Sequence, residues 1–227
     1  MSLQSIVNIS NTLNINRRKL VGIQYARNEL PRISETPTYN PWKLTMGVPS
    51  IQYSQSRSLL EGLDTIDRRT PETITFSDSP GLSWMFRYQG DLNSGQRNAI
   101  TVTSFTGTAL VLNVSSVSTS ALNRVVAAGD FIQIDGYPYP FTATYDVLRG
   151  SSGTVTIVTH RPNIISDSVT GLSLNWGNDV EFNVFCPNMP TYTLAPGGYI
   201  RQGSTVINNA LVTFTDNFLL YEYVASA

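Results

Sequence analysis

Few residues of this chain are of a type that does catalytic chemistry. The sequence contains one histidine, His160, and one cysteine, Cys186. A catalytic triad needs a histidine beside a nucleophile and an orienting group, and neither partner can be placed from the sequence around His160. One histidine and one cysteine cannot form the usual zinc shells, and no acidic run has the spacing of a calcium loop. We therefore expect His160 in a turn or at the rim of a strand, and no cofactor.

Pairs of carboxylates are the second candidate chemistry, because glycoside hydrolases use two facing acids. The pairs that are close in the sequence are Asp64 with Asp67, Asp130 with Asp135, and Asp179 with Glu181. The last pair shares the parity of one strand, so both side chains could lie on one face. A solvated face is the simpler interpretation. We expect no enzymatic activity, and a polysaccharide hydrolase that uses Asp179 and Glu181 is the alternative.

Aromatic side chains form a third candidate site. Tyr137, Tyr139 and Phe141 alternate with Pro138 and Pro140. Exposed rings at this spacing could stack on a carbohydrate or on another protein. The alternative is a proline-braced turn whose rings pack locally, and this is the interpretation that we favour.

Composition limits the class of protein. Only 14% of the 227 residues are charged, against the roughly 25% of a typical domain, and the net charge is −1. We expect no specific nucleic-acid binding, since no basic footprint is present. The amino-terminal sequence has no pattern of a signal peptide, and no apolar run is long enough for a membrane span. We therefore expect a protein that is made and assembled in the cytoplasm.

The first part of the chain, residues 1–97, is predicted to begin a main β domain. Residues 1–25 alternate in hydropathy like an extended arm, and the proline-rich residues 28–50 indicate a long loop. Tyr39 and Trp42 in that loop either pin it to its own core or contact a partner subunit. An apolar stripe of Leu59, Leu60, Leu63 and Ile66 predicts a helix over residues 56–68. A strand over Leu82–Tyr88 would place alternate aromatic residues in the core.

The middle of the chain, residues 98–170, is predicted to be an inserted small β-barrel domain. Short apolar-alternating runs such as Phe131–Ile134, Phe141–Leu148 and Thr154–Val158 are separated by turn residues. Asp135-Gly136 favours a hairpin turn, because glycine accepts a positive φ. These features are typical of a β-meander.

The main domain is predicted to resume over residues 171–227. Prolines and glycines near Pro196 indicate loops, and Val206–Phe214 with Asn217–Val224 are predicted to form a final strand pair. Both faces of the last strand are apolar, since Tyr221 and Tyr223 alternate with other apolar residues. Such a strand is expected where a helix or another subunit covers it.

Two segments resemble structural tail proteins of tailed bacteriophages: GDFIQIDGYPYPFTATYDVLRGSSGTVTIVTHRP (129–162) and NALVTFTDNFLLYEYV (209–224). The resemblance implies a mainly β, tail-tube-like fold of two antiparallel sheets with one flanking helix and the inserted small β domain. It implies a virion location, a ring with an expected six subunits, and docking to other proteins of the baseplate or the tube–baseplate junction. The candidate contact residues are Tyr39, Trp42, Tyr137, Tyr139, Tyr221 and Tyr223.

A receptor- or carbohydrate-binding module of a tail tip is the alternative function. Its candidate contacts are Trp42, Tyr137 and Tyr139. A self-associating structural protein accounts better for the low charge, the long loops and the missing catalytic sets, so we prefer it.

Overall fold

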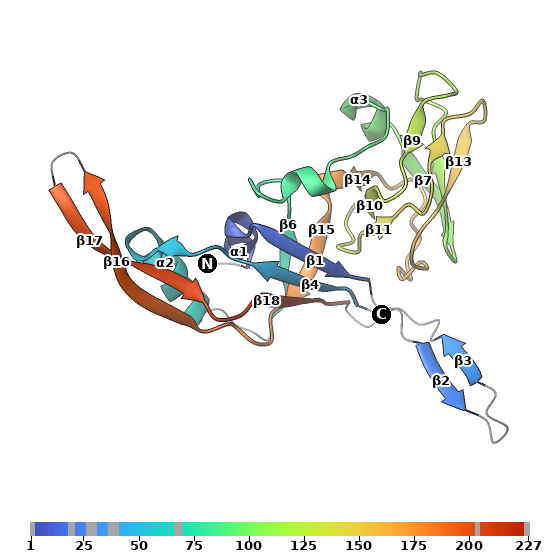
Figure 1. The fold of residues 1–227 in the computed structure, drawn as a ribbon. Helices are drawn as coiled ribbons and strands as arrows, with labels where there is room; N and C mark the ends of the chain where they lie inside the picture. The colour runs from blue at the N-terminus through green and yellow to red at the C-terminus, as the bar shows by residue number, and fades with distance from the viewer. Residues whose placement is uncertain are drawn as a thin grey trace.

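The computed structural model describes residues 3–17, 21–25, 31–35, 41–65, 70–202 and 205–224. The chain is mainly β, as the sequence predicts, with several antiparallel sheets and few helices (Figure 1). In these residues the strands form open sheets of two to five strands and no closed barrel. The predicted small barrel is therefore wrong in closure. Its predicted strands Phe131–Ile134 and Thr154–Val158 are present, whereas Phe141–Leu148 contains only two short strands, Phe141–Thr142 and Val147–Leu148, which belong to different sheets.

The largest sheet has five antiparallel strands and joins the two ends of the chain. In spatial order they are β1 (Thr12–Asn16), β4 (Lys43–Gly47), β18 (Phe218–Glu222), β15 (Glu181–Phe185) and β6 (Glu72–Thr75). Burial alternates along β18: Phe218, Leu220 and Glu222 are buried, whereas Leu219 and Tyr221 are half-buried. One face of this sheet therefore covers a core, and the other faces outward.

The predicted extended arm begins instead with a helix, α1 (Gln4–Ile9). Ile6 and Val7 are fully buried, and Leu3 is buried beside them. Ile6 and Val7 follow Leu3 by three and four positions, which places both beside it on one face of a helix. The predicted loop over residues 28–50 is also wrong in part, because it contains β4 and β3 (Pro31–Glu35).

Helix α2 (Tyr53–Thr65) confirms the predicted helix but starts three residues earlier. Leu59, Leu60 and Leu63 are buried, as the apolar stripe predicts. The Ser56 hydroxyl donates to the Gln52 carbonyl (2.8 Å) at the start of the helix. Residues 66–68 of the predicted helix lie outside the described residues.

One edge of the five-stranded sheet is closed by a side chain. The Gln4 amide donates to the Thr75 carbonyl (2.8 Å), and its oxygen accepts from the Thr75 backbone N–H (2.8 Å). These two bonds imitate the pairing of a neighbouring strand along β6. Because an open strand edge is a template for association, Gln4 protects this edge.

Replacing Gln4 with alanine is expected to remove both bonds to β6 and to destabilise the fold by about 1–3 kcal/mol. The freed edge should also increase concentration-dependent association. Urea unfolding and light scattering at two concentrations measure the two effects. Asn8→Ala is the matched control, because it removes only the Asn8 contact of the Gln4 amide (2.8 Å). Equal behaviour of the two variants would contradict the protective role.

Two β-hairpins extend from the rest of the molecule (Figure 1). The longer one pairs β16 (Tyr192–Gln202) with β17 (Thr205–Phe214), and only its base pairs with β5 (Ile51–Gln52). The shorter one pairs β2 (Val21–Tyr25) with β3.

The long hairpin corrects two predictions. The loop expected around Pro196 is strand, because the register shift between Pro196 and Tyr199 takes up the proline. The expected final strand pair does not form either. β17 pairs with β16 and β5, whereas β18 pairs with β15 and β4, so the turn after Phe214 carries the chain into another sheet.

The middle of the chain forms three small sheets. They are β7 (Thr101–Thr106) with β8 (Ala109–Asn113) and β13 (Thr154–Val158); β9 (Arg124–Val126) with β12 (Val147–Leu148); and β10 (Phe131–Ile134) with β11 (Phe141–Thr142) and β14 (Leu174–Trp176). A short helix, α3 (Ser94–Asn98), precedes them and has a capping box between Asn93 and Gln96. The predicted turn at Asp135-Gly136 is confirmed, with Gly136 at φ +84°.

Buried residues form two hydrophobic cores. One gathers residues from Leu92 to Trp176, and the other gathers residues of the five-stranded sheet, α1 and α2. Phe131 of β10 belongs to the second core, so the two cores meet at this strand. The division into domains at residues 97/98 and 170/171 stays a prediction.

The predicted strand over Leu82–Tyr88 is wrong. Residues Ser83–Phe86 form the 3₁₀ helix η1, which ends the expected alternation. Leu82 and Phe86 are buried, but Trp84 is 67% exposed. A second 3₁₀ helix, η2 (Gly177–Asp179), lies against η1. Gly177 permits this approach, since its φ is +64° and a Cβ atom would lie 2.6 Å from the Tyr88 backbone nitrogen.

Candidate functional site

A buried ion pair joins the two cores. Arg161 follows β13, and Glu222 ends β18. The two guanidinium nitrogens Nη1 and Nη2 donate to Glu222 Oε2 and Oε1, each at 2.8 Å. Nη2 also donates to the Pro140 carbonyl (2.6 Å). Arg161 is 6% exposed and Glu222 is 1% exposed, so the pair is shielded from water.

Aromatic rings surround this pair. The Arg161 guanidinium carbon lies 4.3 Å from the centre of the Trp42 ring, and Arg17 lies 5.6 Å from the same ring. The Trp42 backbone N–H donates to Glu222 Oε2 (3.0 Å). Phe131 packs edge-on against Trp42, with 6.1 Å between ring centres. Burial lowers the pKa of Arg17, whose Nη1 donates to the Thr142 hydroxyl (3.2 Å).

These contacts hold the two cores in a fixed arrangement. We call the group of Arg161, Glu222 and Trp42 the junction. Bidentate pairing sets both the distance and the orientation of the two charged groups. Sequence reasoning did not single out Arg161 or Glu222. A charged residue at an inward position of an apolar strand is the signal that could have found the pair, since Glu222 follows Leu220 by two residues.

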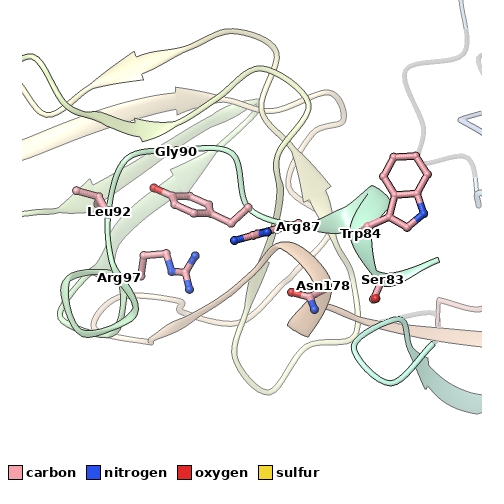
Figure 2. Close-up of a pocket in the computed structure, with 8 residues that line it drawn as sticks. Ser83, Trp84, Arg87, Gly90, Leu92, Arg97 and Asn178 are labelled. Carbon is pink, nitrogen blue, oxygen red and sulfur yellow. The ribbon is translucent and has the colours of Figure 1, made fainter. Parts of the chain in front are cut away.

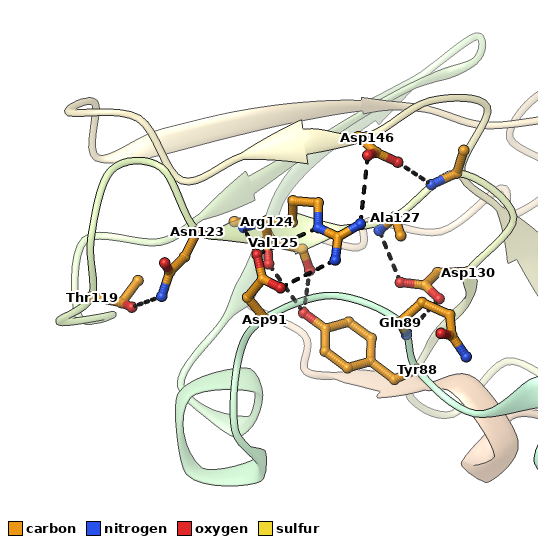
Figure 3. Close-up of polar contacts among 11 residues, drawn as sticks. Tyr88, Gln89, Asp91, Thr119, Asn123, Arg124, Val125, Ala127, Asp130 and Asp146 are labelled. Atoms are coloured by element: carbon orange, nitrogen blue, oxygen red, sulfur yellow. Dashed lines mark hydrogen bonds and ion pairs between the residues drawn. The ribbon is translucent and has the colours of Figure 1, made fainter.

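A second polar network lies on the surface of the middle segment (Figure 3). Arg124 pairs with Asp91 (3.2 Å) and with Asp146 (3.7 Å), and it lowers the pKa of Asp91. The Tyr88 hydroxyl donates to the Val125 carbonyl (2.6 Å), and burial raises the pKa of Tyr88 to about 12.

Asp130 completes this network. Its two carboxylate oxygens accept from the backbone N–H groups of Gln89 and Ala127, each at 2.9 Å. Burial raises the pKa of Asp130. The network therefore holds the segment that follows η1 against the strand β9, and its carboxylates are occupied by protein groups.

The predicted contact residues lie in different places. Trp42 is buried in the junction, so it pins its segment to the core of its own chain. Tyr137 and Tyr139 are half-buried against the other core, and the Tyr137 hydroxyl donates to Asp167 (3.3 Å). Tyr39 lies outside the described residues.

Tyr221 and Tyr223 come together on the outward face of the five-stranded sheet. The Tyr221 ring stacks on Phe185 at 5.8 Å between centres, and Tyr223 packs edge-on against the same ring at 6.3 Å. The Lys43 ammonium lies 5.9 Å from the Tyr221 ring centre. We call this set, with Leu219, the outer aromatic face.

The residues considered for catalysis lie on several different elements. Asp179 ends η2, whereas Glu181 begins β15, so they do not share one strand face; both are exposed. The ring of His160 lies 6.4 Å from that of Trp42. Cys186 is buried, and its thiol donates to the Asn188 carbonyl (3.3 Å).

Neither a metal-binding cluster nor a membrane-spanning helix is found in the part of the chain that the structure describes. Within it, no group of three or more histidine, cysteine or acidic side chains could hold a metal ion. No helix in the same residues has the length and apolarity needed to cross a membrane.

The comparisons with protein families and with curated proteins identify no relative. No protein-family model matches the chain, and no curated protein matches it. The geometry and the resemblance of the two segments are therefore the basis for a function.

Proposed function

We propose that this protein is a structural component of a bacteriophage tail that assembles into a ring in the baseplate or at the tube–baseplate junction. It acts by binding further copies of itself, with an expected six per ring, and by docking to other tail proteins. The ring assembles in the host cytoplasm and ends in the virion tail. The observation that carries the proposal is the long hairpin β16–β17.

This hairpin supports the proposal because, among the described residues, its two strands pair mainly with each other. Among the described residues, β17 has a second partner strand only at Leu211 and Val212, which pair with β5. Leu194 is 46% exposed and Leu211 is 42% exposed on the two strands. An extended hairpin with apolar side chains and free strand edges is suited to adding strands to another subunit.

The five-stranded sheet supplies two further supporting features. The outer aromatic face presents half-buried and exposed rings on the side away from the core. On β1, no described strand pairs with the edge opposite β4, whereas the β6 edge is closed by Gln4. The open β1 edge offers a place for a strand of another subunit, whereas Gln4 excludes the β6 edge from such pairing. The proposal includes a tail-tube-like role for this sheet, in which it forms part of the ring with α2 beside it.

The test is the mass of the purified chain by light scattering, with negative-stain imaging of the same fractions. Rings or stacked tubes are expected. In a shortened variant, residues 196–210 are replaced by Asn-Gly, which joins the paired residues Ala195 and Leu211 by a two-residue turn. This variant is expected to fold but to remain a monomer.

The double variant Leu194→Asp/Leu211→Asp should also disperse the rings, because it places one charge on each face of the hairpin. Leu122→Asp is its control, since Leu122 is 79% exposed but belongs to the middle segment. Dispersal by Leu122→Asp as well, or rings that persist without the hairpin, would contradict the assignment. A compact trimer of the unmodified chain would instead support the alternative, a receptor- or carbohydrate-binding tail-tip module.

A further inference from the structure

A cavity of about 510 Å³ lies where η1, η2 and α3 meet. Its lining includes Ser83, Trp84, Arg87, Tyr88, Arg97 and Asn178. Figure 2 shows the side chains of Arg87 and Arg97 extending toward each other, with Asn178 near them and the Trp84 ring beyond. Neither the predicted contact residues nor the proposed ring accounts for this group.

The two arginines of the cavity have no acidic partner in the described part of the chain. Neither Arg87 nor Arg97 forms an ion pair within these residues, and no carboxylate among them lines the cavity. The nearby acids are occupied: Asp91 pairs with Arg124, and Asp130 accepts from two backbone N–H groups. Two like charges beside one cavity create a positive potential that favours an anion.

Arg97 is stacked on an aromatic ring of its own chain. Its guanidinium carbon lies 4.4 Å from the centre of the Tyr88 ring, and the Tyr88 hydroxyl is held by the Val125 carbonyl. Stacking of this kind leaves the guanidinium N–H groups free to donate in the plane of the group. A preorganised donor loses less entropy on binding.

Trp84 gives the cavity an apolar surface. Its ring is 67% exposed, yet its Nε1 donates to the Gly81 carbonyl (3.0 Å), which fixes the orientation of the indole. An exposed and oriented indole is suited to stacking against the face of a sugar ring. The Ser83 hydroxyl and the Asn178 amide lie in the same lining and can bond to sugar hydroxyl groups.

We propose that this cavity binds an anionic saccharide, a sugar that carries a carboxylate or a phosphate. Arg87 and Arg97 hold the anionic group, and Trp84 stacks on the sugar ring. Ser83 and Asn178 orient the ring through its hydroxyl groups. This function goes beyond the proposed ring and does not require it, because every residue involved lies between η1, η2 and α3.

The experiment uses the full chain with glucuronate, glucose 6-phosphate and glucose as probes. The chain has three tryptophans, of which Trp42 and Trp176 are buried and Trp84 is exposed. Quenching of tryptophan fluorescence by acrylamide therefore reports on Trp84. Both charged sugars are expected to protect Trp84 and to bind at least about tenfold more tightly than glucose. Added salt should weaken this binding.

Variants separate the site from general charge effects. Arg87→Gln/Arg97→Gln is expected to lose about tenfold or more in affinity for glucuronate. Arg57→Gln is the control, because Arg57 also lies over a tyrosine, Tyr53 (5.8 Å), but on α2 outside the cavity. Trp84→Ala should also weaken binding in calorimetry, where no tryptophan signal is needed.

Several results would overturn the proposal. The first is equal affinity for glucose and glucuronate. The second is undiminished glucuronate binding by the double arginine variant. The third is no binding heat in calorimetry and no protection of Trp84 from acrylamide with any probe at millimolar concentration. Tighter binding of adenosine monophosphate than of either charged sugar would reassign the cavity to a nucleotide. None of these results depends on whether the chain forms rings.

Discussion

Replacing Glu222 with alanine is expected to lower the free energy of unfolding by about 3–5 kcal/mol. The change leaves the Arg161 guanidinium, which is 6% exposed, without its bidentate acceptor. It also removes the acceptor of the Trp42 backbone N–H. A buried charge without a partner costs more than the pair itself contributes, because the charge has lost its water. Urea unfolding followed by circular dichroism measures the loss.

The double variant Arg161→Met/Glu222→Leu tests the cause. Because it removes both charges, it is expected to unfold at a higher urea concentration than Glu222→Ala. Glu181→Ala is the matched control, since Glu181 is an exposed glutamate on the neighbouring strand β15, and its loss should stay within about 0.5 kcal/mol. A loss of only about 1 kcal/mol for Glu222→Ala is typical of a weak surface ion pair. It would contradict the claim that this pair holds the two cores together.

Replacing Gly177 with alanine is the second change with a large expected effect. The left-handed backbone at φ +64° costs a residue with a Cβ about 1–2 kcal/mol. The new Cβ would also lie 2.6 Å from the Tyr88 nitrogen and 2.7 Å from the Phe86 oxygen. Forcing these backbones apart adds about 1–3 kcal/mol. The same urea measurement gives the sum of the two costs.

Gly171→Ala separates these two costs. Gly171 has φ +83°, but a Cβ atom added there would have no neighbour within 4 Å, so only the backbone cost applies. Gly177→Ala must therefore be the more destabilising of the two variants. It should also weaken glucuronate binding, because the clash moves η2, and with it Asn178, away from η1. Equal losses for both variants would show that the close approach of η1 and η2 contributes nothing.

Local sequence patterns specify the fold class and the elements with a strong period. The leucine stripe of α2 and the alternation of Phe131–Ile134 and Thr154–Val158 predict helix and strand without knowledge of the neighbours. The turn at Asp135-Gly136 is local as well, since the positive φ of glycine suffices to specify it.

Elements that the sequence patterns assigned wrongly depend on contacts between distant residues. Leu82–Tyr88 has the alternation of a strand, yet it forms η1, because Gly177 from another part of the chain packs against its backbone. β17 and β18 are adjacent in the sequence, but each finds its partner strands elsewhere. Strand pairing is a non-local choice, which hydropathy alone does not encode.

The sites exist only in the folded chain. Arg161 and Glu222 are 61 residues apart, and folding makes them a buried pair. Arg87 and Asn178 reach one cavity because η1 and η2 pack together. Sequence patterns relate residues that are close along the chain, such as Asp179 and Glu181, whereas a site requires groups that are close in space. The chain thus specifies many of its strands and its helix α2 locally, and folding alone brings the charges together.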